Sequence, residues 1–426
     1  MTYQNFINLA LEKGFTNIQI AIETIISTEA SYINKKLDDY SDINKTIYQV
    51  KAELNNKVET LYTEYLDENI LNILIEKINL TDTNYQDDFI EPRKVTSINH
   101  NKIVSIREEI KKVNELDNLR KDYPLIKSLE LFYSDDYQET RIINSKGLDI
   151  QTSEHTYHFI AEAKAEKNDS SSSFDRRILV TDKEKIDFVA IVKEVLEKAT
   201  LLVTKEKLET KKYNVILDSK VATTIISNLK NMLSAQSIRK KTSCLDGKLN
   251  KKIFSPKLSI VEEPLNNNYP GYTIFDKEAS FTINKTIIEN GKLKTYLYDS
   301  KEAKLENIAS TGNGYGQIST RNMYVTPSSA SMEELLSKLD SGLYITDQMG
   351  SSGSSINEAT GNISVQVFGY IVKNGKIVSG FVPAVMSTTI FELLSNIEEV
   401  GNDLAFQRKD VGTPSLYIKN ISIASE

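Results

Sequence analysis

The sequence is poor in the residues that most often form cross-links or catalytic sites. Its 426 residues include one cysteine, three histidines and no tryptophan. A single cysteine excludes an internal disulfide and any zinc site built from several thiolates. The aromatic part of the core must therefore come from the 21 Tyr and 14 Phe residues.

Long hydrophobic runs are also missing. No apolar stretch approaches the roughly 18 residues of a membrane-spanning helix, and the N-terminus lacks the basic-then-apolar pattern of a secretory signal. We therefore expect a cytoplasmic protein without membrane association. A net charge of −7 and a pI near 5.4 argue against general affinity for nucleic acid, because phosphate binding needs clustered Lys and Arg.

Histidine, the usual ligand of a peptidase zinc ion, is scarce. The candidates are His100, His155 and His158, and none of them is followed by Glu. Zinc peptidases place two His on one helix, with a Glu beside the first as general base. Because His155 and His158 lie three residues apart on a predicted strand, their side chains should point to opposite faces. We predict no metal site, no cofactor and no catalytic residue in this chain.

Cys244 is the remaining candidate nucleophile. It follows Lys240 and Lys241, and nearby cations can lower the pKa of a thiol. A lone cysteine is more often a small, partly buried hydrophobic residue. Independent hydrolase activity through Cys244 is kept as an alternative hypothesis.

The hydrophobic patterns predict an α+β protein with two domains. We expect an N-terminal domain of helices and sheet over residues 1–210 and a strand-rich, barrel-like C-terminal domain over residues 211–426. In the N-terminal domain the predicted helices lie near residues 6–14, 66–78, 103–120 and 181–199, the last opened by a capping box at 181–184. Short strands are predicted at 128–133, 140–144 and 156–163, and the polar region 34–46 is predicted to be a hairpin or loop.

Local signals in the C-terminal half are clearer. Asp218 is a predicted N-cap for a helix, and Asn290-Gly291 and Asn374-Gly375 have the composition of two-residue hairpin turns. Ser331 and Thr389 should cap two further helices, the second ending at Gly401.

A series of ordered motifs then resembles one protein family. The stretches are 243–249 (SCLDGKL), 254–264 (FSPKLSIVEEP), 275–278 (FDKE), 289–299 (ENGKLKTYLYD), 310–313 (STGN), 321–325 (RNMYV), 335–346, 349–350, 358–362 (EATGN), 369–376, 400–404 (VGNDL) and 413–416 (TPSL). In this order they resemble the TldD/PmbA family, and specifically its TldE/PmbA branch. Two positions depart from the family pattern: Cys244 replaces an aromatic residue and Asn250 replaces a glycine.

The resemblance implies a non-catalytic subunit of a two-subunit metallopeptidase. In the TldD-like sister, a helix carries two His and a Glu, and a Cys ligand lies near the C-terminus. Here the corresponding helix spans 218–234 without such residues, and the segment 404–412 has no cysteine. The resemblance therefore implies zinc on a TldD-like partner and a substrate of peptides or unfolded segments.

The resemblance also implies an enclosed chamber between the two subunits. If this chain lines that chamber, the predicted loop contacts with the substrate are Asn313, Gly350, Thr360 and Gly361. The simpler interpretation of each is a turn residue. A further alternative for the whole chain is a stand-alone peptide-binding or scaffold homodimer without peptidase activity.

Overall fold

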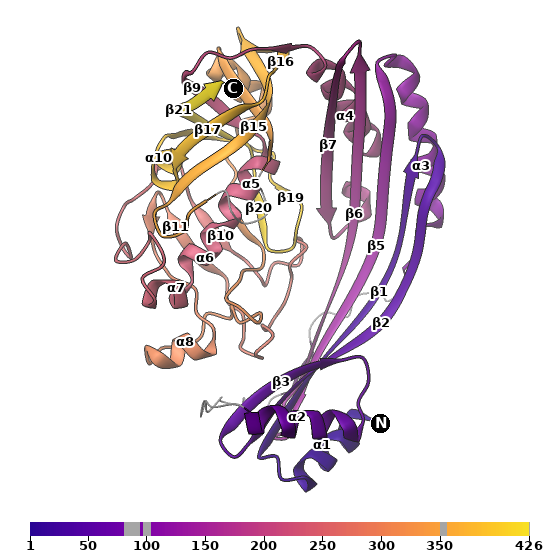
Figure 1. Ribbon diagram of the computed structural model, residues 1–426, viewed down its shortest axis with the longest axis vertical. Helices are drawn as coiled ribbons and strands as arrows, with labels where there is room; N and C mark the ends of the chain where they lie inside the picture. The colour runs from indigo at the N-terminus through magenta and orange to yellow at the C-terminus, as the bar shows by residue number, and fades with distance from the viewer. Residues whose placement is uncertain (81–93, 97–103, 350–355, 426) are drawn as a thin grey trace.

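The computed structural model describes residues 1–80, 94–96, 104–349 and 356–425. It contains a long twisted sheet, a small lobe at one end of that sheet, and a strand-rich C-terminal part beside it (Figure 1). The mixture of helices and strands, together with a closed ring of strands in the C-terminal half, confirms the predicted fold class. None of the helices in the described ranges is long and apolar enough to cross a membrane.

The N-terminal sheet has seven strands in the order β3-β2-β1-β5-β6-β4, with β7 also paired to β6. They are β1 (Asn17–Ile33), β2 (Lys36–Leu54), β3 (Lys57–Thr63), β4 (Lys94–Thr96), β5 (Ile126–Asn144), β6 (Asp149–Lys167) and β7 (Ser170–Val180). All pairings are antiparallel except that of β4 with β6.

Two strand predictions in this sheet are wrong. The expected short strands are parts of β5 and β6, which run unbroken for 19 residues each. Polar residues interrupt the alternation of apolar residues in β5, so the sequence predicted a break there. Ser134 and Asp135 are nevertheless buried, because hydrogen bonds satisfy their side chains. The predicted hairpin or loop at 34–46 is a hairpin, with a tight turn at Asn34 and Lys35 between β1 and β2. The rest of the region is the first half of β2, which is mostly exposed and so lacks apolar alternation.

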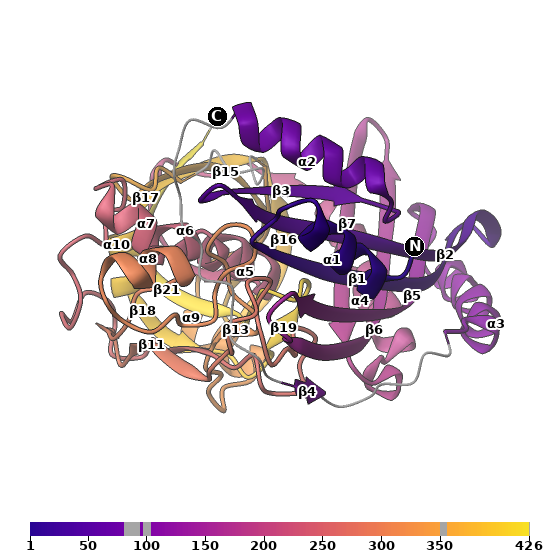
Figure 2. The ribbon, with the colours of Figure 1, turned by 90° about the horizontal axis from the view of Figure 1, so that it is seen from below.

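The helices of the N-terminal half are α1 (Tyr3–Glu12), α2 (Glu68–Leu80), α3 (Arg107–Leu116) and α4 (Phe188–Leu202), with short 3₁₀ turns η1 (Asp117–Asp122) and η2 (Lys183–Lys185). Helices α1 and α2 pack with the ends of β1, β2 and β3 to form the core of the small lobe (Figure 2). The first three predicted helices are confirmed within a few residues.

The predicted capping box at 181–184 is wrong. Asp182 caps η2, and the helix α4 begins only after Asp187, whose side chain accepts from the Ala190 N–H. The Thr181 hydroxyl instead donates to the carbonyl of Asn268. The predicted inward face is confirmed at 192, 196 and 199, but Val189 is 46% exposed. In this first turn Phe188 makes the contact with the sheet, against Tyr133 and Phe159.

The C-terminal half contains a barrel. Its larger sheet follows the order β14-β9-β21-β17-β15-β16-β8, and an additional β14–β15 pairing closes five of these strands into a ring. These strands are β8 (Lys205–Glu206), β9 (Lys211–Leu217), β14 (Gly342–Met349), β15 (Asn362–Lys373), β16 (Lys376–Phe381), β17 (Ala384–Thr389) and β21 (Leu416–Ser425), with β18 (Ile397–Val400) paired to β21.

A second sheet of six strands, in the order β12-β11-β10-β13-β20-β19, lies next to it in the C-terminal half. It is made of β10 (Ile260–Glu262), β11 (Lys285–Glu289), β12 (Lys292–Leu293), β13 (Met323–Val325), β19 (Ala405–Phe406) and β20 (Val411–Thr413). The helices here are α5 (Ser219–Ser227), α6 (Leu229–Leu233), α7 (Ala235–Arg239), α8 (Ser300–Leu305), α9 (Met332–Leu339) and α10 (Ile390–Ser395).

The turn and cap predictions of this half are largely confirmed. Asn290-Gly291 and Asn374-Gly375 adopt positive φ angles in hairpin turns, and Ser331 forms a capping box with Glu334. The helix capped by Thr389 is shorter than expected, because α10 ends at Ser395 and β18 follows. Asn250 has φ +62°, so it keeps the left-handed conformation that the family's glycine would adopt.

A shared core joins the two halves around α4. This helix packs against β6 and β7 on one side, and its hydrophobic cluster continues into the barrel through Tyr344, Tyr370 and Tyr417. The Tyr370 hydroxyl donates to the carbonyl of Lys198 at 2.9 Å. The N-terminal sheet and the barrel therefore share one continuous apolar layer.

A buried ionic cluster lies in this layer. The Arg176 guanidinium on β7 donates to both carboxylate oxygens of Asp218 at 2.8 and 3.1 Å and also to Glu194 on α4. Burial alone would raise the pKa of Asp218, but the charges of Arg176 and Lys198 outweigh it and hold this pKa well below its usual range. Asp218 also accepts from the Tyr344 hydroxyl and caps α5.

We expect Arg176→Met to lower the free energy of unfolding by about 3 kcal/mol, because it leaves the buried Asp218 carboxylate without its main partner. Lys164→Met is the matched control. It removes an exposed ion pair with Glu130 and should cost no more than about 1 kcal/mol. Guanidinium denaturation of both variants measures the difference. Equal losses for the two variants would contradict the role assigned to the cluster.

Candidate functional site

The helix that the resemblance equates with the sister's zinc helix lies against β20, which begins at the end of the segment 404–412 where the sister would carry its Cys. Helix α5 packs on β20, although about 190 residues separate them. Their contact is a hydrogen bond of 2.7 Å between the hydroxyls of Thr223 and Thr413, both buried. The Thr413 hydroxyl in turn donates to the Ser219 carbonyl at 3.1 Å. The two hydroxyls therefore satisfy one another and the helix backbone.

These residues do not fit a zinc ion. Protein zinc is bound by Cys sulfur, His nitrogen or Asp and Glu oxygen. Helix α5 reads SKVATTIIS and offers none of these ligands. The carboxylate of Asp410, just before β20, is already paired with Lys230. Among the described residues, no group of three or more His, Cys, Asp and Glu side chains is arranged to hold a metal.

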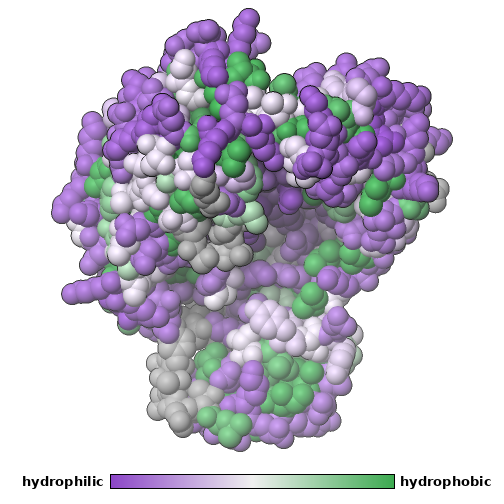
Figure 3. All heavy atoms as spheres, turned by 45° about the horizontal axis from the view of Figure 1, so that its top comes forward, coloured by the Kyte–Doolittle hydropathy of each residue, from purple (hydrophilic) through white to green (hydrophobic). Residues whose placement is uncertain are grey.

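A cavity of about 540 Å³ opens beside the first turn of α5. It lies between the β6–β7 hairpin and the barrel, and Lys220 at its wall forms ion pairs with Asp175 and Asp347. Phe368 and Phe381 supply an apolar wall. In the space-filling view the surface is hollowed between the two upper parts of the molecule (Figure 3).

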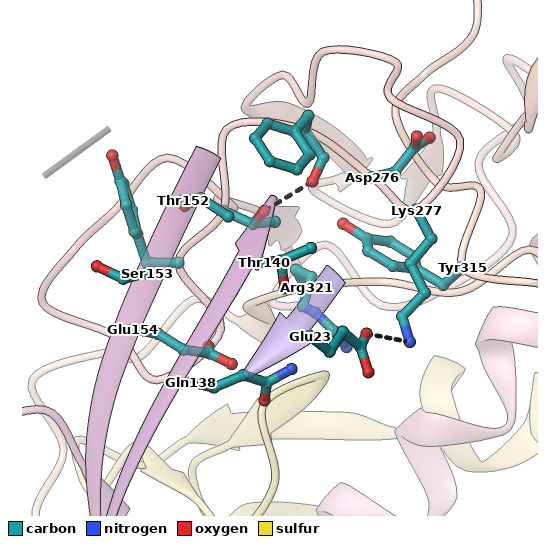
Figure 4. A pocket seen from close by; sticks show the side chains of 13 residues that line it. Glu23, Gln138, Thr140, Thr152, Ser153, Glu154, Asp276, Lys277, Tyr315 and Arg321 are labelled. Atoms are coloured by element: carbon teal, nitrogen blue, oxygen red, sulfur yellow. Dashed lines mark hydrogen bonds and ion pairs between the residues drawn. The ribbon is translucent and has the colours of Figure 1, made fainter. Parts of the chain in front are cut away.

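A second, smaller pocket brings together segments singled out by the sequence motifs. Loop residues from 272–277 and from 315–321 face strands β1, β5 and β6 of the N-terminal sheet (Figure 4). The pocket measures about 40 Å³ and is lined by Glu23, Gln138, Thr140, Thr152, Ser153, Glu154, Tyr272, Thr273, Phe275, Asp276, Lys277, Tyr315 and Arg321. We call it the interdomain pocket.

Two ion pairs hold the walls of the interdomain pocket together. Lys277 of the C-terminal half lies 2.6 Å from Glu23 on β1 (Figure 4). Lys409, from the segment before β20, lies 2.6 Å from Glu154 on β6. Each pair crosses from the C-terminal half to the N-terminal sheet, so the pocket's shape depends on how the halves dock.

Arg321 and Tyr315 form one wall of the pocket. The Arg321 guanidinium lies over the Tyr315 ring at 4.5 Å from its centroid. Among the described residues, this guanidinium has no carboxylate partner and no hydrogen-bond acceptor. The Tyr315 hydroxyl is buried, likewise lacks a hydrogen-bond partner there, and has its pKa raised by burial.

Asp276 lies at the back of the pocket and is almost fully buried. Burial, and after it the charge of the neighbouring Glu278 carboxylate, raise the pKa of its carboxyl to about 8. Three backbone N–H groups, those of Glu278, Ser280 and Gly314, donate to it at 2.8–2.9 Å and oppose the shift. At neutral pH this carboxyl is mostly protonated and carries little charge.

The predicted substrate contacts lie in separate surroundings. Asn313 is fully buried, and its amide donates to the Glu262 carboxylate and to the Ser319 carbonyl. Thr360 is exposed in a turn, and Gly361 next to it has φ +77° with an N–H bonded to Asn357. Gly350 lies outside the described residues. Substrate contact at these positions stays a prediction.

The other candidates have local roles. His155 lies 2.5 Å from the Asp135 carboxylate, whereas the ring of His158 packs edge-on against Phe132. Burial lowers the pKa of His158. Burial raises the pKa of the Cys244 thiol, whose sulfur lies 3.9 Å from that of Met232, so the thiol is not activated. His100 lies outside the described residues.

Sequence reasoning missed the interdomain pocket. The motifs FDKE and RNMYV were recognised at 275–278 and 321–325, but no role followed from them. The charged residues Asp276, Lys277 and Arg321 within these motifs were the available signal. That they line one pocket with Glu23 and Glu154 of the N-terminal sheet depends on tertiary contacts.

Asp276 should make stability depend on pH. Its folded pKa near 8 lies above the unfolded value of about 3.9, so the folded state holds a proton that the unfolded state has released. The free energy of unfolding should therefore fall as pH rises from about 4 to 8, by up to about 1.4 kcal/mol per pH unit. Asp276→Asn should flatten this decline.

Denaturant titrations at several pH values measure how the free energy of unfolding changes with pH. This slope is independent of any pH-independent loss of stability that the substitution causes. Asp182→Asn, at an exposed cap, serves as the control and should leave the slope unchanged. An unaltered slope in Asp276→Asn would show that this carboxyl titrates normally.

Comparison with known proteins identifies the family of this chain. The family model for the PmbA/TldA metallopeptidase C-terminal domain matches residues 210–425, just over half of the chain, and that for the central domain matches residues 99–203. A Haemophilus influenzae protein named Metalloprotease PmbA homolog is 31% identical over 220 residues, 51% of this chain and 47% of that protein. The chain thus aligns with about half the length of that relative.

Other similarities extend over the whole chain. An uncharacterized protein of Methanocaldococcus jannaschii is 26% identical over 433 residues, 98% of this chain and 99% of its own. A solved structure from Thermotoga maritima, described as a candidate modulator of a DNA gyrase, has a TM-score of 0.87 at 26% identity and covers 99% of this chain and 100% of that one. TldE from Thermococcus kodakarensis has the same fold, with a TM-score of 0.85 at 19% identity over 99% of both chains. This chain belongs to the PmbA/TldD family and is TldE/PmbA-like.

Proposed function

We propose that this chain is the non-catalytic subunit of a cytoplasmic metallopeptidase complex that degrades or processes peptides and unfolded segments. Zinc and the catalytic residues would reside on a TldD-like partner. Relatives named as metalloproteases support a role connected with peptide hydrolysis. Relatives named TldD homologs and a structure named TldE support the idea of two related subunits.

One observation carries the proposal. The Thr223–Thr413 hydrogen bond occupies the position where α5 meets β20, and neither element offers a zinc donor. In the catalytic sister, the resemblance expects His and Glu on the helix that corresponds to α5 and Cys in the segment that corresponds to 404–412. On this proposal, the fold of the site is kept in this chain while the zinc chemistry belongs to the partner.

The remaining role is structural and concerns substrate access. The cavity of about 540 Å³ beside α5 has charged and aromatic walls, a combination suited to an extended peptide with mixed side chains. A subunit that presents this cavity to a zinc-bearing partner can complete a chamber, exclude folded proteins and hold an unfolded segment.

Two rivals predict different behaviour. A stand-alone peptide-binding homodimer needs no partner and has no peptidase activity in any mixture. A hydrolase acting through Cys244 is active alone and loses its activity in Cys244→Ala. The raised pKa of the Cys244 thiol argues against the second rival, since the thiolate is the nucleophilic form.

The test is to measure zinc content and peptidase activity of the purified chain, with and without a co-expressed TldD-like partner. We expect a zinc-free, inactive chain and a zinc-loaded, active mixture. Cys244→Ala should leave the mixture's activity unchanged, and a partner stripped of its zinc ligands should abolish it. Stoichiometric zinc or peptide cleavage by the chain alone would overturn the proposal.

A further inference from the structure

We propose that the interdomain pocket binds a carboxylate group, held by the Arg321 guanidinium and the Tyr315 hydroxyl. The chemical class is a small carboxylate, either a free acid or the C-terminus of a peptide. The peptide source rests on the proposed function, whereas the pocket itself does not. Four features of the described residues carry the inference.

The first feature is the state of Arg321. A guanidinium has five N–H donors in a planar fork that matches a carboxylate in a bidentate arrangement. Arg321 is half-buried at the pocket wall, yet no described carboxylate lies within 4 Å of its nitrogens. Its guanidinium lies over the Tyr315 ring, a contact that uses the face of the guanidinium and none of its N–H donors. By contrast, Arg141, Arg176 and Arg239 each pair with a carboxylate.

The second feature is the Tyr315 hydroxyl. A buried hydroxyl without a hydrogen-bond partner destabilises the folded state, so native structures seldom keep one. This hydroxyl lies in the same pocket and can donate to a carboxylate oxygen that Arg321 also binds (Figure 4).

The third feature is the charge of the walls. Glu23 is neutralised by Lys277, and Glu154 by Lys409. Asp276 accepts three backbone N–H bonds at the back of the pocket and carries little charge at neutral pH. Arg321 is then left with an uncompensated positive charge, which favours a monoanion and disfavours an amine.

The fourth feature is size. A volume of about 40 Å³ is roughly enough for a carboxylate group or a few water molecules. Tyr272 and Phe275 supply apolar surface next to the polar wall, suited to the carbon attached to the carboxylate. A nucleotide or a folded segment does not fit this space.

The test uses the full chain alone and compares an acetylated Ala-Ala dipeptide bearing a free C-terminus with its C-terminal amide, by calorimetric titration. We expect millimolar affinity for the acid, and at least tenfold weaker binding for the amide. Arg321→Gln should weaken binding of the acid at least tenfold. Arg408→Gln, a highly exposed arginine in the segment that also carries Lys409, is the matched control and should bind like the unmodified chain.

Tyr315→Phe gives a second, independent readout. It should weaken binding of the acid about fivefold, because one hydrogen bond is lost. In the ligand-free chain it should raise the thermal midpoint by about 1–2 °C, since the unpartnered hydroxyl is removed. A tyrosine with only a packing role would not combine weaker binding with a higher midpoint.

Titration with sodium acetate distinguishes the two sources of the carboxylate, a free small acid and a peptide C-terminus. Acetate binding equal to that of the dipeptide acid supports the pocket and assigns it to free small acids. Much tighter binding of the dipeptide acid supports a peptide C-terminus. The proposal is overturned if the amide binds as well as the acid, if Arg321→Gln binds unchanged, or if no acid binds at millimolar concentration. Since no partner subunit is present, these outcomes are independent of the peptidase test.

Discussion

The pairing of Arg176 with Asp218 is the interaction on which the arrangement of this molecule depends. Arg176 belongs to the N-terminal sheet, whereas Asp218 belongs to the C-terminal half and caps α5. Glu194 and Lys198 add contacts from α4, and Tyr344 adds one from the barrel. A buried charge is stable only when it is paired, so the sheet, the helix and the barrel must meet in one geometry for the cluster to form. That geometry fixes the start of α5.

The consequences reach both cavities. The larger cavity opens where the β6–β7 hairpin meets the barrel, next to Lys220 at the beginning of α5. The interdomain pocket forms farther along the same junction, where Lys277 and Lys409 reach the sheet. The residues that dock the halves differ from those at the contact of α5 with β20, where the hydroxyls of Thr223 and Thr413 bond to each other. The docking of the halves and the chemistry of that contact therefore depend on different side chains.

Local structure was predictable wherever a short-range signal decides it. The Asn-Gly turns, the Ser331 capping box and the Asp218 cap follow from interactions within four residues. Predictions failed where pairing overrides local pattern. Strand β2 is polar through its first half, so the sequence predicted only a hairpin or loop there, but 17 of its residues are paired with β1. In β5, buried Ser134 and Asp135 broke the apolar alternation although both are satisfied by partners across the sheet region.

The sequence by itself determined what this chain lacks and to which family it is similar. One cysteine, three histidines and a helix reading SKVATTIIS offer few donor atoms for a zinc site, and this is visible before any fold is known. Only the tertiary structure decided which side chains lie where α5 meets β20 and where Arg321 lies. Thr223 and Thr413 are 190 residues apart, and the walls of the interdomain pocket come from both halves of the chain. Such contacts depend on strand pairing and burial over long sequence distances, which no local pattern encodes.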